Sequence, residues 1–99
     1  MPTAKLQIAD GGFDGMVYEI VAEETLIGRN PTTDVTLLDE NISREHALIT
    51  FDPDRGCYSI EDLQSTNGTK VNGKGIRACE LVEGDEIQVG TTRFRFSCE

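Results

Sequence analysis

Apolar and polar residues alternate along much of this chain, as they do in β-strands that bury one face. Leu6 and Ile8 alternate with Lys5 and Gln7 near the start of the chain. The same two-residue period returns in four later apolar sets, which are Ala47, Ile49 and Phe51; Tyr58 and Ile60; Ile87 and Val89; and Phe94 and Phe96. Short strands at this regular spacing predict an all-β sandwich or barrel.

The longest stretch without glycine or proline, residues 32–52, is where a helix competes with this prediction. Its apolar residues with helical spacing are Val35, Leu38, Ile42 and Ile49. Three polar residues at 39–41 interrupt that run, and Glu45 and His46 would fall on its apolar face. The β-branched pair Val35-Thr36 also favours a strand. We therefore expect a strand, a loop and a strand.

Glycine-containing pairs mark the expected turns. Asn67-Gly68 and Asn72-Gly73 are typical of type I′ hairpin turns, whose two central residues need positive φ. Residues 10–15 predict a turn between the first two strands. Residues 52–56 resemble a calcium loop superficially, but they lack the later glutamate and are interpreted as a hairpin tip.

The length and composition fit one domain over residues 1–99, with a core from about residue 5 to residue 97. No apolar run approaches the roughly 18 residues of a membrane span, and the N-terminus lacks a long apolar secretory segment. We therefore expect a cytoplasmic protein with no membrane partner. The isolated domain is expected to be a monomer.

The balance of charge is acidic, with 18 acidic against nine basic residues and a formal net charge of −9. This balance disfavours a nucleic acid as partner, because affinity for the phosphate backbone comes from lysine and arginine. Cys57, Cys79 and Cys98 have no C-x-x-C spacing. Reduced thiols are favoured over one disulfide plus a spare thiol. With one histidine and dispersed cysteines, neither a metal site nor a cofactor is predicted.

Three loop segments carry candidate chemistry: Leu26-Ile27-Gly28-Arg29, Ser43-Arg44-Glu45-His46, and the run from Asp62 to Thr69 that continues to Val71-Asn72-Gly73. Taken singly, each has an ordinary structural explanation, such as a solvated charge, a turn cap or a buried histidine. Their order and spacing resemble the forkhead-associated domain family, as does Leu81-Val82-Glu83-Gly84-Asp85 with Ile87 and Gly90 near the end. The resemblance covers about residues 5–97. It implies two stacked, mostly antiparallel sheets of about eleven short strands, with binding loops at one end.

The resemblance also implies recognition of phosphothreonine in an extended segment of a partner protein, for phosphorylation-dependent signalling or assembly. Arg29, Ser43, Arg44 and Thr66 correspond to phosphate contacts, and Asn67 to the side chain that hydrogen-bonds the ligand backbone. Other matched positions shape and brace the loops, namely Gly28, His46, Gly68, Asn72 and Gly73. The chemistry agrees with the resemblance, because a guanidinium offers paired donors to a phosphate group that carries about −1.5 to −2 charges.

Two other functions, hydrolysis and phospho-independent binding, also fit parts of the sequence. Ser43 and His46 lie three residues apart as in a hydrolase site, but no nucleophile elbow or oxyanion hole accompanies them, so no catalytic residue is predicted. The remaining alternative keeps the fold and uses it as a phospho-independent interaction or oligomerisation module.

The residues that would contact the flanks of the ligand are left open. Lys70, Lys74 and Arg77 are either readers of acidic flanks or solvated charges. The acidic surface itself predicts a ligand with basic or apolar flanks.

Overall fold

Eleven β-strands make up the secondary structure of the computed structural model, which describes residues 3–10 and 15–98. Within these residues there is no helix, so none is present that could span a membrane. The strands form two sheets in which a single pair, β3 and β4, is parallel and the other pairs are antiparallel. The predicted all-β sandwich with mostly antiparallel sheets is confirmed.

The two sheets contain six and five strands. The six-stranded sheet has the order β2-β1-β11-β10-β7-β8, made of β2 (Val17–Ile20), β1 (Ala4–Asp10), β11 (Thr92–Cys98), β10 (Glu86–Val89), β7 (Thr69–Val71) and β8 (Lys74–Ile76). The five-stranded sheet has the order β4-β3-β5-β6-β9, made of β4 (Val35–Thr36), β3 (Glu24–Gly28), β5 (Ala47–Asp52), β6 (Cys57–Asp62) and β9 (Ala78–Leu81).

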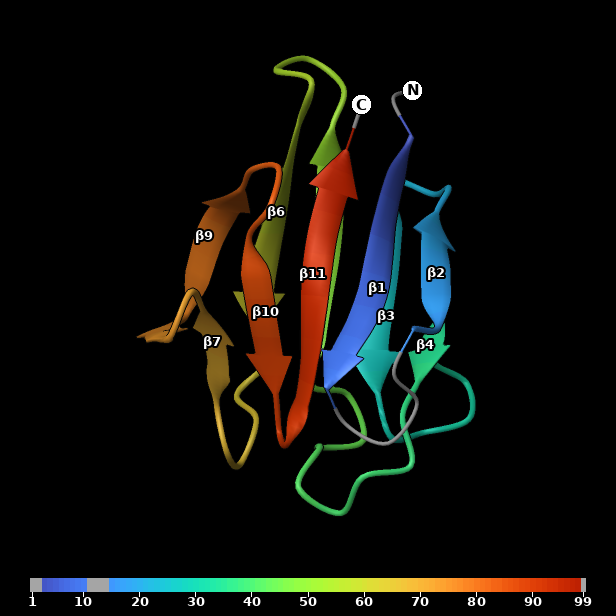
Figure 1. Ribbon diagram of the computed structural model, residues 1–99, viewed down its shortest axis with the longest axis vertical. Helices are drawn as coiled ribbons and strands as arrows, with labels where there is room; N and C mark the ends of the chain where they lie inside the picture. The colour runs from blue at the N-terminus through green and yellow to red at the C-terminus, as the bar shows by residue number, and fades with distance from the viewer. Residues whose placement is uncertain (1–2, 11–14, 99) are drawn as a thin grey trace.

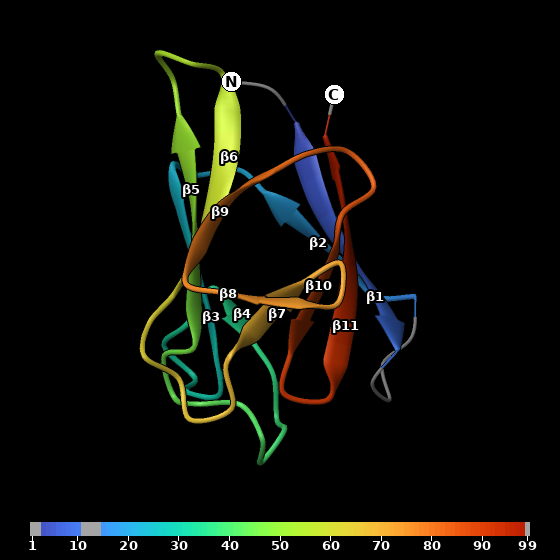
Figure 2. The same cartoon turned by 90° about the vertical axis from the view of Figure 1, so that its left-hand side faces the viewer.

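The core lies between the two layers, which are seen nearly edge-on in Figure 2. Leu6, Phe94 and Phe96 from one sheet and Ile27 and Ile60 from the other have no exposed surface. The alternation predicted from the sequence places these side chains on the inner faces, because successive residues of a strand point to opposite sides. Aromatic rings join the layers: the ring centroids of Tyr58 and Phe96 are 5.5 Å apart, within the range of favourable edge contacts.

The two open sides of the sandwich differ. On one side the chain crosses from β8 to β9 through a single residue, Arg77, so the edges of the two sheets are joined covalently. On the other side the edge strands β2 and β4 face each other, and the chain crosses between the sheets through residues 21–23, which join β2 to β3 and not to the edge strand β4 (Figure 1). This second side keeps two shallow hollows that share Tyr18.

The ends of the described chain lie at one end of the sandwich, and the loops that follow β3, β4 and β6 lie at the other (Figure 1). This arrangement follows from the strand directions, because β3 and β6 run toward the loop end and β5 runs away from it. The candidate residues at 28–46 and 62–68 are therefore gathered at the same end.

One of the two predicted Asn-Gly hairpins is confirmed and the other is wrong. Asn72 and Gly73 have φ values of 53° and 83° and connect the paired strands β7 and β8, as a type I′ turn requires. Asn67-Gly68 is no hairpin, because β6 and β7 belong to different sheets and only Gly68 of this pair has a positive φ. The hairpin tip at residues 52–56 is confirmed between β5 and β6. Residues 11–14 of the predicted early turn lie outside the described residues.

Candidate functional site

The loop end brings together three segments that are distant in sequence. These are the chain after β3 at Arg29, the loop between β4 and β5 at residues 37–46, and the loop between β6 and β7 at residues 63–68. A set of hydrogen bonds between the segments holds them in place. Each bond places a candidate residue of one loop against the backbone of another.

Gly28 allows the first two segments to touch. A Cβ atom at this position would lie 2.1 Å from the Arg44 carbonyl oxygen, a distance that no side chain tolerates. The close approach lets the Arg29 amide donate to the Ser43 carbonyl at 3.0 Å and the Asn30 amide to the Arg44 carbonyl at 3.1 Å. The backbones of Arg29 and Arg44 are therefore held beside each other, while both side chains are exposed.

His46 braces the second and third segments from within. The imidazole has no exposed surface, and its Nδ1 accepts a hydrogen bond from the Ser43 amide at 3.1 Å. Nε2 must then carry the ring proton, which it donates to the Gly68 carbonyl at 2.8 Å. The His46 carbonyl accepts from the Leu63 amide, which adds a further bond between the loops.

The hydroxyl of Ser43 has a defined role as a hydrogen-bond acceptor. Its Oγ accepts a hydrogen bond from the Thr66 amide at 3.0 Å. Since a serine hydroxyl has one hydrogen to donate, that hydrogen remains available for another acceptor. Ser43 itself is half-buried, and its backbone is held by the hydrogen bonds to Arg29 and His46.

Asp62 organises the third segment, of which it is the first residue, although the sequence assigned it no role. Its carboxylate accepts from the Ser65 hydroxyl, from the Ser65 amide at 3.1 Å and from the Thr69 hydroxyl at 2.7 Å. Burial alone would raise the pKa of Asp62, but these hydrogen bonds prevail and lower it below the usual range. The Ser65 hydroxyl in turn accepts from the Gly68 amide, so the loop is tied to the end of β6.

Asp39 anchors the loop between β4 and β5, and sequence reasoning missed it as well. One carboxylate oxygen accepts from the Asn41 amide and the other from the Thr91 amide and hydroxyl. The pKa of Asp39 is lowered, because the hydrogen bonds from Thr91 and Asn41 outweigh the burial that would raise it. An Asx turn at Asp39 with Asn41 was the available sequence signal for the local half of this arrangement.

The remaining candidate residues divide into two groups. Thr66 and Asn67 are exposed beside Ser43, and the Asn67 Nδ2 donates to the Asn41 carbonyl at 2.8 Å. Asn72 and Gly73 lie in the turn between β7 and β8, away from this cluster in the fold. Asn72 binds the Asp85 carboxylate and the Glu86 amide there, so it braces β10 and not the loops.

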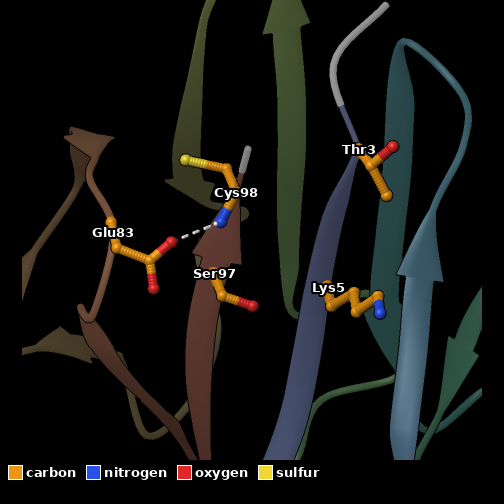
Figure 3. A pocket seen from close by; sticks show the side chains of 5 residues that line it. All are labelled: Thr3, Lys5, Glu83, Ser97 and Cys98. Atoms are coloured by element: carbon orange, nitrogen blue, oxygen red, sulfur yellow. Dashed lines mark hydrogen bonds between the residues drawn. The ribbon is translucent and has the colours of Figure 1, made fainter.

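A separate hollow of about 240 Å³ lies near the ends of the chain. Figure 3 shows the five residues that line it, Thr3, Lys5, Glu83, Ser97 and Cys98. Within it the Cys98 amide donates a hydrogen bond to the Glu83 carboxylate at 2.8 Å. It has one lysine and lies at the opposite end of the sandwich from Arg29 and Ser43 (Figure 1). In the described residues, no three potential metal ligands are grouped there or elsewhere.

The sequence profile of the FHA domain matches residues 25–90, which include all three loop segments. The chain belongs to the FHA domain family. This FHA domain is 38% identical over 94 residues to the glycogen accumulation regulator GarA of Mycobacterium tuberculosis, covering 95% of this chain and 57% of GarA. It spans between 57% and 64% of the length of the curated relatives first matched.

Solved structures agree with the sequence relatives. A structure from an analysis of phosphothreonine-dependent FHA domain interactions superposes on this FHA domain with a TM-score of 0.85. The two are 31% identical, and the match covers 98% of this chain and 96% of that one. EmbR of Mycobacterium tuberculosis, solved with a low-affinity phosphopeptide, gives a TM-score of 0.86 at 35% identity, over 96% of this chain and 24% of EmbR.

Proposed function

We propose that this FHA domain binds phosphothreonine in an extended segment of a partner protein, through the loops that carry Arg29, Ser43 and Thr66. The observation that carries the proposal is the Ser43 hydroxyl. It accepts from the Thr66 amide and therefore keeps its own hydrogen for an anionic oxygen. The side chains of Arg29 and Arg44 are exposed. The two chain segments that carry them are hydrogen-bonded to each other through their backbones, which the close approach at Gly28 allows.

The two arginines supply positive charge to the site, and the Ser43 hydroxyl supplies a directional hydrogen bond. Within the described part of the chain, neither guanidinium is used in an ion pair or side-chain hydrogen bond. Both can therefore donate to phosphate oxygens without breaking an existing contact, and such charge-assisted bonds are about twice as strong as neutral ones. A site with its backbone fixed beforehand loses less conformational freedom when the ligand binds.

Asn67 is suited to the ligand's backbone and not to its phosphate. Its Nδ2 donates one hydrogen to the Asn41 carbonyl. An asparagine amide has two N–H hydrogens and one carbonyl oxygen, so one hydrogen and the Oδ1 acceptor remain for a peptide group. Thr66 lies next to Asn67 and is exposed, so both side chains can face the same ligand residue.

The geometry supports binding without catalysis by Ser43 and His46. A hydrolytic pair would need the imidazole to accept a proton from the serine hydroxyl. Here Nδ1 of His46 faces the Ser43 amide, and Nε2 faces the Gly68 carbonyl, so neither nitrogen is directed at Oγ. We accordingly propose a binding module with no enzymatic activity of its own. We also propose a cytoplasmic location, which the three unpaired cysteines support.

Calorimetric titration with three matched pools of synthetic peptides tests the proposal. The pools differ at one central position, which is threonine, phosphothreonine or phosphoserine, and their flanks are randomised. We expect binding to the phosphothreonine pool, and a loss of roughly tenfold to hundredfold in Arg29→Ala, since hydrogen bonds to charged groups are worth about 1.5–3 kcal/mol. Arg55→Ala is the matched control, because the Arg55 guanidinium is exposed and pairs with the exposed Glu80, away from the loop end.

Two results would contradict the proposal. One is equal binding of the threonine and phosphothreonine pools. The other is an unchanged affinity in Arg29→Ala. Either result would favour the phospho-independent interaction module instead.

A further inference from the structure

Exposed apolar side chains are concentrated on the open side of the sandwich. Five large apolar side chains are exposed in the described residues, and four of them lie in or next to β2 or just after β4: Met16, Val17, Val21 and Leu38. The fifth, Val82, lies elsewhere. Single exposed apolar residues need no explanation, but their concentration on one side indicates a contact surface.

Two of these residues line a hollow that we call the side hollow, formed by Met16, Tyr18, Thr36, Leu37 and Leu38. Its volume is about 200 Å³. An engineered cavity of about 150 Å³ in another protein accepts benzene, so this hollow is large enough for one ring or one branched aliphatic side chain. It lies where β2 begins and β4 ends, which is the loop end of the sandwich (Figure 1).

Leu38 is the most exposed of the apolar residues, at 82%, and its backbone neighbours are fixed on both sides. The preceding Leu37 is buried and its amide donates to the Gly28 carbonyl at 2.9 Å. The following Asp39 is bound to Thr91. The leucine side chain is thus presented to solvent by a held backbone, which reduces the ordering that a partner would require on contact.

The rim of this side is acidic. A second hollow of about 110 Å³ shares Tyr18 with the side hollow and includes Glu19, Glu24 and Asp34 in its lining. Neither lining contains a lysine or an arginine among the described residues. An apolar side chain that is accompanied by lysine or arginine complements such a surface, whereas an acidic segment would be repelled by it.

The side hollow is continuous with the phosphate-binding loops through the backbone. The Gly28 carbonyl that receives the Leu37 amide belongs to the residue before Arg29. Leu38 also shares a loop with Asn41 and Ser43. The Asn41 carbonyl accepts the hydrogen bond from the Asn67 side chain. A protein that is held at Arg29 and Ser43 therefore has the side hollow beside its binding site.

We propose that the side hollow is a second recognition site for the same partner that supplies the phosphothreonine. It takes one large apolar side chain that is flanked by lysine or arginine and lies outside the phosphothreonine segment. This inference rests on the proposed function. The phosphate site then selects the modified residue, and the side hollow selects among proteins that carry one.

A synthetic peptide library tests this directly. Every peptide carries a fixed phosphothreonine with three alanines on either side, followed by ten randomised residues at one end or the other. Ten extended residues reach about 33 Å, close to the longest extent of the molecule, 35 Å. We expect selected peptides to combine leucine, isoleucine, methionine or phenylalanine with lysine or arginine. They should bind about tenfold tighter than the unextended phosphopeptide, which corresponds to about 1.4 kcal/mol.

Variants assign the gain to the side hollow. Leu38→Asp and Met16→Asp should remove the tenfold gain. Met16 lies outside the three loops, so Met16→Asp should leave the affinity for the unextended phosphopeptide unchanged. Glu24→Lys should reduce the enrichment of lysine and arginine. Val82→Asp is the matched control, because Val82 is 59% exposed at another surface, and it should retain the full gain.

The outcomes separate this inference from the proposed function. If the unextended phosphopeptide does not bind, the proposed function fails and the inference fails with it. If it binds but no extension is enriched, or the gain survives Leu38→Asp, the inference alone is overturned. Equal enrichment on peptides with unmodified threonine would assign the hollow to a partner that binds independently of phosphothreonine. Self-association of the domain that Leu38→Asp abolishes would assign the hollow to a second copy of the chain. Both results would also overturn the inference.

Discussion

The two connections at the ends of β6 show how differently this sandwich treats its turns. Before β6, the tip at residues 52–56 closes on itself, because Asp52 accepts hydrogen bonds from the amides of Asp54 and Arg55 in the same turn. After β6, the loop at residues 63–68 bonds to other segments through Thr66 to Ser43, Asn67 to Asn41 and Gly68 to His46. Both connections begin at an aspartate that ends a strand. The contact of the first with another segment is the exposed Arg55–Glu80 pair, whereas the second is held by several hydrogen bonds to two other loops.

The difference supports the loops that we propose as the ligand site. A turn that only reverses the chain needs no partner beyond its own residues. A loop that must offer donors at fixed positions is stabilised by its neighbours, because movement of about 1 Å would misplace them. The bracing is thus a structural sign of the site that does not depend on the family resemblance.

The largest effect on this bracing is expected from His46→Ala. The substitution removes the acceptor of the Ser43 amide and the donor to the Gly68 carbonyl, and it leaves a cavity in a position with no exposed surface. Each unsatisfied buried group costs about 1–3 kcal/mol, so we expect the free energy of unfolding to fall by roughly 3 kcal/mol or more. Urea unfolding followed by circular dichroism measures it.

Arg29→Ala is the control for this prediction. Arg29 is exposed, so its removal should change the unfolding free energy by less than about 0.5 kcal/mol while weakening phosphopeptide binding. An unfolding midpoint for His46→Ala equal to that of the wild type would refute the bracing role of the imidazole.

A smaller effect on stability should distinguish Asp62 from Asp52, the aspartates at which the two connections begin. In Asp62→Asn one carboxylate oxygen becomes an NH₂ group, which then faces the Ser65 amide or the donating hydroxyls. We expect a loss of about 1–3 kcal/mol in unfolding free energy at neutral pH. In Asp52→Asn a single oxygen, Oδ1, keeps both amide hydrogen bonds, so the loss should stay below about 0.5 kcal/mol. Equal losses would erase the distinction between the two connections.

The Asp62 effect should also depend on pH. The pKa of Asp62 is lowered in the folded state, so its contribution to stability is complete above the unfolded pKa of about 3.9. It is lost as the pH falls through the lower, folded-state pKa. The gap in unfolding free energy between wild type and Asp62→Asn should therefore narrow below about pH 4. A gap of constant size down to pH 2 would contradict this account.

Five of the seven interior strands could be predicted from the sequence by their alternation, because each buries one face. Alternation locates β1, β5, β6, β10 and β11, since every second side chain enters the core. The edge strands are harder to predict. β8 has the sequence Lys-Gly-Ile with no buried residue, and β2 buries only Ile20. Without a buried face there is no period to detect.

The candidate site was predictable in its exposed residues and less so in its supports. Arg29, Ser43 and Thr66 were named from the family spacing, and the fold places them at the same end. The supporting roles of Asp39 and Asp62 were not predicted, because their partners Thr91, Ser65 and Thr69 are determined by tertiary contacts or by an irregular loop. Gln64, at a φ of 56°, is part of that loop and has no sequence signal of its own.

The central claim is that the three braced loops form the ligand site, and one measurement tests it most directly. Two-dimensional ¹H–¹⁵N NMR of the labelled domain, titrated with a phosphothreonine peptide, reports every backbone amide at once. We predict that the largest shifts fall on Arg29, Ser43, Arg44, Thr66 and Asn67, and that the amides of residues 54–57 stay unchanged. Largest shifts at Lys5, Glu83 and Cys98, at the opposite end, would contradict the account.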